Sequence, residues 1–244
     1  MRQLPDIFFY KNDKVAQFIL DKKMDIKQSS KVIYLDNNAT TMVSPEVVEV
    51  MTPFFSECYG NTSSMHEFGG SVSRDIKKAR EQVAFLVGAA SPNEIFFTSC
   101  GTESANMAII GALELNKGKK HLITTNVEHP CVLNTYKWLE KRGYEVTWLN
   151  VNSEGELDIE EVKNSIKEDT CLISVMWANN ETGVIFPVEK IAEITKEKNP
   201  STIVFVDAVQ AAGKIPVNVM TTKIDMLAIS GHKFHAPKGV GALY

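Results

Sequence analysis

Short apolar runs alternate along the chain with stretches whose apolar positions recur at helical spacing. The runs with the character of strands are residues 95–98, 122–125, 144–149, 172–177, 203–207 and 226–229. Mostly apolar strands that are separated by helices are typical of a parallel sheet covered on both faces. The pattern therefore predicts one α/β domain with a mostly parallel central sheet and helices on both faces.

Helical spacing also occurs before the first of these runs. Ser44 followed by Pro45 is a strong helix start, and Val47, Met51 and Phe54 are the expected buried stripe. A second helix is predicted at 73–88, with Ile76, Ala79, Val83 and Leu86 facing the core. Other predicted elements are a short strand at 32–35 and helices near 103–116, from 130 to a glycine cap at 143, from 158 and from 187. Residues 1–31 form an N-terminal extension with no assigned role.

The predicted strands run into polar or reactive residues. In chain order, these include Thr102, His129, Asn179, Asp207, Gln210 and Lys233. Ligands of open α/β sheets bind outside the carboxyl ends of the strands. One ligand is therefore expected to meet all of these groups.

This set of side chains suits pyridoxal phosphate (PLP). The amine of Lys233 can hold the PLP aldehyde as an imine, and the Asp207 carboxylate can keep the pyridine nitrogen protonated, so that the ring acts as an electron sink. A helix that starts at Gly101 and Thr102 offers free amides and a positive dipole end to the phosphate. The interval between Asp207 and Lys233 leaves room for one crossover and one strand.

Each of these residues also has an ordinary structural interpretation. A lone lysine just past a strand is usually a surface residue. Asp207 and His129 could each cap a helix, and Asn179 and Gln210 could satisfy turns. The argument for a cofactor rests on the whole set.

Composition and charge narrow the possible partners. The 244 residues carry a formal net charge of −4 with no basic tract, so the sequence indicates neither nucleic acid nor a membrane surface. No apolar stretch approaches the length that spans a bilayer. The four cysteines are widely spaced, which indicates no zinc site or disulfide framework and fits a reduced cytoplasm. His232 and His235 have no carboxylate or cysteine near them in sequence, so no metal is predicted.

Several motifs occur in a fixed order from about residue 32 to the last residue. They are residues 34–41 (YLDNNATT), 59–64 (YGNTSS) followed by His66, 98–104 (TSCGTES), 127–130 (VEHP), 175–183 (VMWANNETG), 206–210 (VDAVQ) and 230–233 (SGHK). In these motifs the chain resembles cysteine desulfurases of the nitrogen-fixation (NifS-like) type, which are PLP enzymes of the class V aminotransferase superfamily.

The resemblance implies the large domain of a PLP-dependent transferase of fold type I, the aspartate aminotransferase fold, over residues 32–244. It implies that Lys233 and His129 are catalytic, with His129 stacked on the ring and moving protons, and that Gln210 reaches the ring hydroxyl oxygen. The cofactor-binding set that it implies is Gly101, Thr102, His129, Asn179, Asp207, Gln210, Ser230, His232 and Lys233. In that set, Ser230 and His232 join Thr102 at the phosphate.

In the complete family enzyme, L-cysteine gives L-alanine and an enzyme persulfide that feeds iron–sulfur cluster assembly. The partners that the resemblance implies are L-cysteine, a second copy of the chain in a homodimer, and an iron–sulfur scaffold or other sulfur acceptor protein. The family's nucleophilic loop cysteine and substrate-binding arginine lie beyond the motif at 231–244, so the expectation is an incomplete chain without the small C-terminal domain. Selenocysteine lyase, a class V aminotransferase, and a non-catalytic PLP-binding remnant or interaction module stay open as alternatives.

Overall fold

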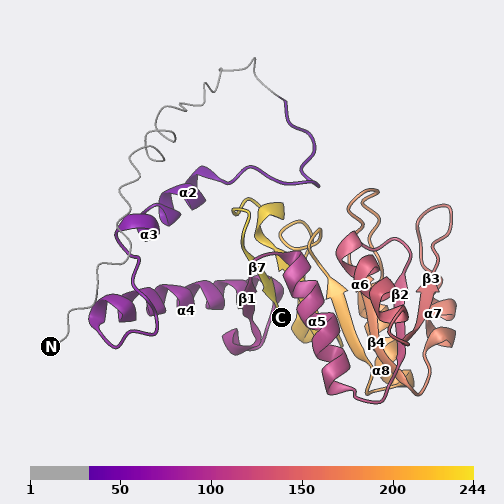
Figure 1. Ribbon diagram of the computed structural model, residues 1–244. Coiled ribbons are helices and arrows are strands. Elements are labelled where there is room, and N and C mark those ends of the chain that lie inside the picture. The colour runs from indigo at the N-terminus through magenta and orange to yellow at the C-terminus, as the bar shows by residue number, and fades with distance from the viewer. Residues whose placement is uncertain (1–32) are drawn as a thin grey trace, which may run out of the picture. The chain divides into compact units, whose positions relative to one another are not determined.

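The sheet lies in the part of the chain that the computed structural model describes, residues 33–244 (Figure 1). The contacts divide the chain between Leu35 and Asp36, and the elements below belong to residues 36–244. The predicted extension at 1–31 lies outside the described residues. The strand predicted at 32–35 is wrong in its described part, because Ile33, Tyr34 and Leu35 are exposed and have no strand partner.

Seven strands form the sheet, in the order β1-β7-β6-β5-β4-β2-β3. Their bounds are Phe96–Thr98 (β1), His121–Thr125 (β2), Glu145–Leu149 (β3), Thr170–Met176 (β4), Ile203–Asp207 (β5), Met226–Ser230 (β6) and Gly241–Leu243 (β7). Strands β2 to β6 pair in parallel, whereas β7 runs antiparallel to both of its neighbours, β1 and β6. The predicted mostly parallel sheet is confirmed, and β7 is an addition that the sequence pattern did not indicate.

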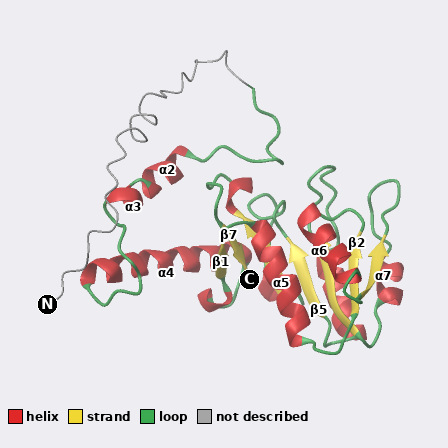
Figure 2. Cartoon of the chain, in the orientation of Figure 1, coloured by secondary structure: helices red, strands yellow, loops and turns green. Residues whose placement is uncertain are grey.

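Helices cover both faces of the sheet, and the core residues show which helix packs where (Figure 2). On one face, α5 (Gly101–Leu115) and α6 (Pro130–Glu140) pack with Leu122, Leu172 and Phe205 of the strands. On the other face, α7 (Ile159–Ser165) and α8 (Val188–Lys198) pack with Ile123, Ile173 and Val204. Consecutive strand residues thus point to opposite faces, as the pleat requires, and both faces are buried.

The helices that precede the sheet in the chain do not pack as predicted. They are α2 (Pro45–Met51), α3 (Pro53–Ser56) and α4 (Glu67–Val87). Ser44 caps α2 as predicted, but neither α2 nor α3 has a buried residue, so the expected stripe of Val47, Met51 and Phe54 is wrong. The expected inward face of α4 is also wrong at Ile76, which is 42% exposed. The reason is that α4 reaches the core only through its last turns, at Ala84 and Val87.

Short 3-10 turns complete the chain, at Pro92–Glu94 (η1), Val219–Thr221 (η2) and Gly231–Lys233 (η3). The last of these directly follows β6 and carries Lys233 at the carboxyl edge of the sheet. Within residues 33–244, no helix has both the length and the apolar character that crossing a membrane requires.

Candidate functional site

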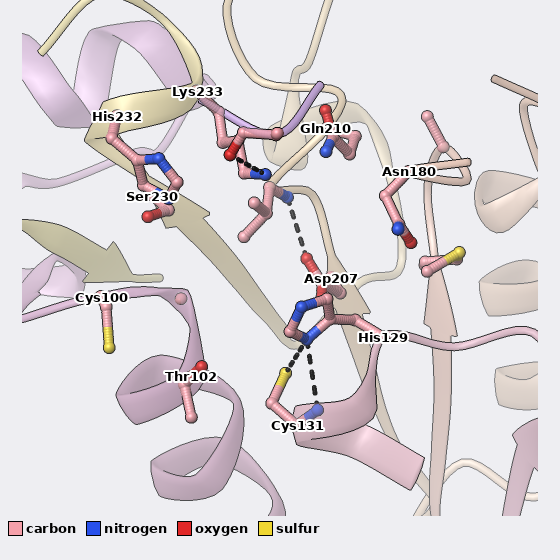
Figure 3. Close-up of a pocket in the computed structure, with 15 residues that line it drawn as sticks. Cys100, Thr102, His129, Cys131, Asn180, Asp207, Gln210, Ser230, His232 and Lys233 are labelled. Carbon is pink, nitrogen blue, oxygen red and sulfur yellow. Dashed lines mark hydrogen bonds between the residues drawn. The ribbon is translucent and has the colours of Figure 1, made fainter. Parts of the chain in front are cut away.

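A cavity of about 270 Å³ opens at the carboxyl ends of the parallel strands. Its walls come from the heads of α5 and α6, the ends of β4, β5 and β6, and the loop at Ala39 (Figure 3). The predicted site residues that line it are Gly101, Thr102, His129, Asp207, Gln210, Ser230, His232 and Lys233. The structure therefore brings together every predicted site residue except Asn179.

Asp207 is the buried carboxylate of the cavity. It is the last residue of β5, it is 6% exposed, and its Oδ1 accepts a hydrogen bond of 2.9 Å from the backbone N–H of Val209. Burial raises the pKa of Asp207, while the Val209 bond and the positive charges of His129 and Lys233 oppose that rise. A cation placed against this carboxylate would replace the water that burial has removed.

Lys233 also lines the cavity and is half-buried. Burial lowers the pKa of Lys233, and the carboxylates of Asp207, Asp36 and Glu181 act in the other direction. Its Nζ donates to the carbonyl oxygens of Asn38 and Ala39, the second at 3.0 Å. A desolvated amine of this kind is more easily deprotonated, and hence more nucleophilic, than a surface lysine.

The loop that Lys233 contacts is held against the site by several bonds, and we call residues 38–44 the strap. The backbone N–H and the hydroxyl of Thr41 both donate to the His232 carbonyl oxygen, at 2.8 and 3.0 Å. His232 Nδ1 lies 3.0 Å from the hydroxyl of Thr40. The sequence analysis gave the strap no site residue, although the motif at 34–41 was a signal for one.

The head of α5 has the geometry of an anion site. A Cβ on Gly101 would lie 2.7 Å from Val209 Cγ2, so the absent side chain lets the helix start close against the strand ends. Cys100 precedes the helix and makes no side-chain cap bond. The amide groups of Glu103 and Thr102 and the Ser99 hydroxyl lower the pKa of the Cys100 thiol, whereas burial and the Glu103 carboxylate act to raise it. Free amides at a helix start favour negative charge.

The head of α6 is occupied by its own cap. His129 Nδ1 accepts the backbone N–H of Cys131 at 3.2 Å and lies 3.0 Å from Cys131 Sγ. Figure 3 shows the His129 ring beside Asp207, on the wall of the cavity. The predicted cap is confirmed, and the same ring lines the cavity. Its stacking on a cofactor ring stays a prediction.

Gln210 is oriented by a lysine that the sequence analysis missed. Lys214 Nζ lies 2.6 Å from Gln210 Oε1, and Gln210 Nε2 donates to the carbonyl oxygen of Asn38 at 2.8 Å. An ammonium group has no acceptor, so the atom that faces Lys214 must be the amide oxygen. Lys214 thus fixes which way the Gln210 amide points. Its spacing of four residues from Gln210 was the available signal.

Asn179 and its neighbour Asn180, to which the sequence analysis gave no role, differ in where they lie. Asn179 Oδ1 accepts the backbone N–H groups of Glu181 and Thr182, both at 2.9 Å, and its Nδ2 donates to Val127 O at 3.1 Å. Asn179 therefore lies as a turn residue, while Asn180 lines the cavity. A cofactor contact by Asn179 stays a prediction.

These features define an α/β protein with a lysine, a buried carboxylate and an open helix head around one cavity. The family described as aminotransferase class-V matches residues 33–244, and the chain belongs to that family. The predicted family and fold are confirmed. Enzymes of this family are in general PLP-dependent.

Individual relatives and solved structures show which members of this family the chain is similar to. A cysteine desulfurase of Nostoc sp. is 58% identical over 213 residues, which cover 87% of this chain and 52% of the relative. A solved NifS-like protein has a TM-score of 0.84 at 47% identity, with 87% of this chain and 58% of that chain covered. A structure titled SspA in complex with cysteine has a TM-score of 0.83 at 40% identity, with coverage of 87% and 61%. The chain thus spans about half the length of the curated relative.

Proposed function

We propose that residues 32–244 form the PLP-binding large domain of a cysteine desulfurase. The observation that carries the proposal is the meeting of Lys233, Asp207 and the open head of α5 in one cavity. The likeness to a cysteine desulfurase of Nostoc sp. and to a structure with bound cysteine supports the choice of reaction and substrate.

The residues present fit PLP at each of its functional groups. Lys233 would hold the aldehyde carbon, and Asp207 would face the pyridine nitrogen. The free amides at Gly101 and Thr102, with Ser230 and His232, would hold the phosphate. His129 would lie on the ring face, and Gln210 would offer its Nε2 to the ring hydroxyl oxygen. The cavity volume of about 270 Å³ is near the lower end for small-molecule sites, which suits one aromatic ring and its substituents.

When bound, PLP supplies an electron sink for bonds at the carbon that carries the substrate amine. The chain's own groups provide the rest. The Asp207 carboxylate would hold a proton on the ring nitrogen, because a buried anion without a cation is costly. Lys233 Nζ and the His129 imidazole are the groups that can take and return protons within the cavity.

The products and partners follow from this chemistry. L-cysteine would lose its sulfur to a protein thiolate and leave as L-alanine, and the sulfur would pass to an iron–sulfur scaffold or other acceptor protein. We place the reaction in the cytoplasm, because thiolate and persulfide sulfur persist in reducing compartments.

We also infer a homodimer. Several large apolar side chains of α3 and α4 are exposed, with Phe55 at 76%, Ile76 at 42% and Phe85 at 90%. Apolar surface of this kind is typical of a protein–protein interface. Sedimentation velocity of the purified protein should show a mass twice that of the chain.

The test of the proposal is the site of PLP attachment. The protein loaded with PLP is reduced with borohydride and digested, and the pyridoxyl label is located by mass spectrometry. The label is expected on Lys233, to be lost in Lys233→Ala, and to persist in the control Lys238→Ala, which removes an exposed lysine nearby. A label on Lys214 would contradict the assignment of Lys233. Alanine and sulfide released from L-cysteine then test the reaction.

A further inference from the structure

Glu128 is a buried carboxyl group that the proposed reaction does not use. It lies in the turn between β2 and α6 and is only 4% exposed. Its Oε1 accepts two hydrogen bonds of 2.9 Å, from the Thr125 hydroxyl and from the backbone N–H of Met176. Its Oε2 is buried and has no hydrogen-bond partner among the residues that the structure describes.

The hydrogen bonds of Glu128 join the ends of β2 and β4, and β4 pairs with β5, which carries Asp207. Thr125 ends β2, and Met176 ends β4, so the Glu128 carboxyl bridges two neighbouring strands. Met176 is paired with Asp207 in the ladder of β4 and β5, and the next N–H, that of Trp177, donates to the Asp207 carbonyl oxygen at 2.9 Å. His129 follows Glu128 in the chain. One side chain therefore links His129 on one wall to Asp207 on the floor.

The surroundings of Glu128 also decide its charge. The groups that face it are Thr125 from β2, Met176 from β4, Asp207 from β5, and Cys131 and Tyr136 from α6. No lysine, arginine or histidine lies within ion-pair distance of it among residues 33–244. Burial, together with the negative charge of Asp207, raises the pKa of Glu128 to about 8, whereas the bonds from Met176 and Thr125 act to lower it.

We propose that Glu128 is a positioning residue of the PLP site: its neutral carboxyl ties the ends of β2 and β4 together and leaves Asp207 as the single anion under the ring. The proposal rests on the proposed function, because Asp207 needs its charge only for a protonated ring nitrogen. A second carboxylate at Glu128 would raise the pKa of Asp207 further and favour its neutral form. A protonated Glu128 retains both accepted hydrogen bonds and adds no charge.

A comparison of three variants tests the two parts of this proposal. Glu128→Gln keeps a neutral group with an oxygen that can accept both bonds. Glu128→Ala removes the bridge, and Glu154→Gln is the matched control at an exposed glutamate. The first readout is the melting temperature of the cofactor-free chain from pH 5 to pH 9, which requires no activity and no PLP.

The direction of the change in melting temperature follows from the protons that the folded and unfolded chains bind. Below about pH 4.5, Glu128 binds its proton in both the folded and the unfolded chain. As the pH rises to about 8, the unfolded chain releases this proton and the folded chain retains it, so the wild type loses stability over that window. Glutamine has no such proton. The melting temperature of Glu128→Gln relative to wild type should therefore rise by at least about 5 °C between pH 5 and pH 8, and the control should stay level.

The second readout is the dissociation constant of PLP at pH 7, from fluorescence titration. Glu128→Gln should bind within about threefold of wild type, and Glu128→Ala at least about tenfold more weakly, as is common for groups that orient a site. If the melting temperatures of wild type and Glu128→Gln change in parallel with pH, the claim that Glu128 is neutral in the folded chain is wrong. Equal PLP affinity in Glu128→Ala would overturn the positioning role. A wild-type chain that takes up no PLP would instead overturn the proposed function, and the positioning role with it.

Discussion

The heads of α5 and α6 lie on either side of the same cavity, and they differ in how their first amides are used. Each helix follows a strand of the sheet and carries a cysteine next to its start, Cys100 before α5 and Cys131 in the first turn of α6. At α6, Pro130 has no N–H to offer and His129 accepts the N–H of Cys131. At α5, no side chain caps the helix.

The pKa values of the two cysteines differ in the same way. At α5, the amides lower the pKa of Cys100, whereas burial and the nearby Asp207 and Glu128 raise the pKa of Cys131 to about 12. A helix start is thus a better anion site where its amides are left free than where a side chain caps them. This comparison supports the proposal that the phosphate of PLP binds at the head of α5, while the head of α6 positions the His129 ring.

The largest expected effect is in the alkylation rates of the two cysteines. Both are half-buried, so the thiolate population should decide the order. The pKa of Cys131 is raised to about 12, so very little of it is thiolate at pH 7.5, whereas the lowered pKa of Cys100 leaves it more ionised than an ordinary cysteine. The greater nucleophilicity of the more basic thiolate offsets only part of this difference. Iodoacetamide should therefore modify Cys100 at least about 30-fold faster, as measured by mass spectrometry over time.

The chain unfolded in urea is the control for this experiment, because both cysteines should react there at similar rates. Equal rates in the folded chain, or faster reaction at Cys131, would show that the two helix heads do not differ in their electrostatics.

A smaller effect is expected from alanine at two glycines of α5. At Gly101 the new Cβ would lie 2.7 Å from Val209 Cγ2, and this crowding should lower the free energy of unfolding by about 1–3 kcal/mol. Gly111 has no atom within 4 Å of its Cβ position, so Gly111→Ala should instead stabilise the chain by about 0.5–1 kcal/mol. Urea unfolding of both variants gives the comparison.

A double variant, Gly101→Ala with Val209→Ala, tests whether contact with Val209 causes the loss of stability. If contact with Val209 is the cause, the double variant should recover stability relative to the sum of the two single changes. A Gly101→Ala variant as stable as Gly111→Ala would mean that α5 does not depend on close approach to the strand ends.

Local signals in the sequence were sufficient for most of the fold. Ser44 and Asp158 cap helices where the sequence placed them, because a cap bond spans only two or three residues. The burial of α2 and α4 could not be predicted in the same way, because an apolar stripe does not show what covers it. The strand β7 was missed because its antiparallel pairing with β1 depends on residues that are distant in the sequence.

The site shows the same division between local and distant information. The positions of Lys233, Asp207 and the head of α5 at the ends of predicted strands were enough to predict that they meet at one edge of the sheet. Which of the two adjacent asparagines faces the cavity depends on the conformation of the turn. In that turn, the side-chain oxygen of Asn179 accepts two backbone N–H groups. The bridge from Glu128 to Met176 joins residues 48 apart, and no local pattern reveals it.

The smallest expected effect concerns the caps themselves. His129→Ala removes the acceptor of the Cys131 N–H and should lower the free energy of unfolding of the PLP-free chain by about 1 kcal/mol, whereas His129→Asn should retain most of the cap. Cys100→Ala should cost less than about 0.5 kcal/mol, because Cys100 makes no cap bond at the head of α5. Urea unfolding at pH 7 without PLP separates these cap effects from any effect on the cofactor. If Cys100→Ala costs as much as His129→Ala, then the thiol does cap α5, its first amides are not free, and the phosphate site must be sought elsewhere.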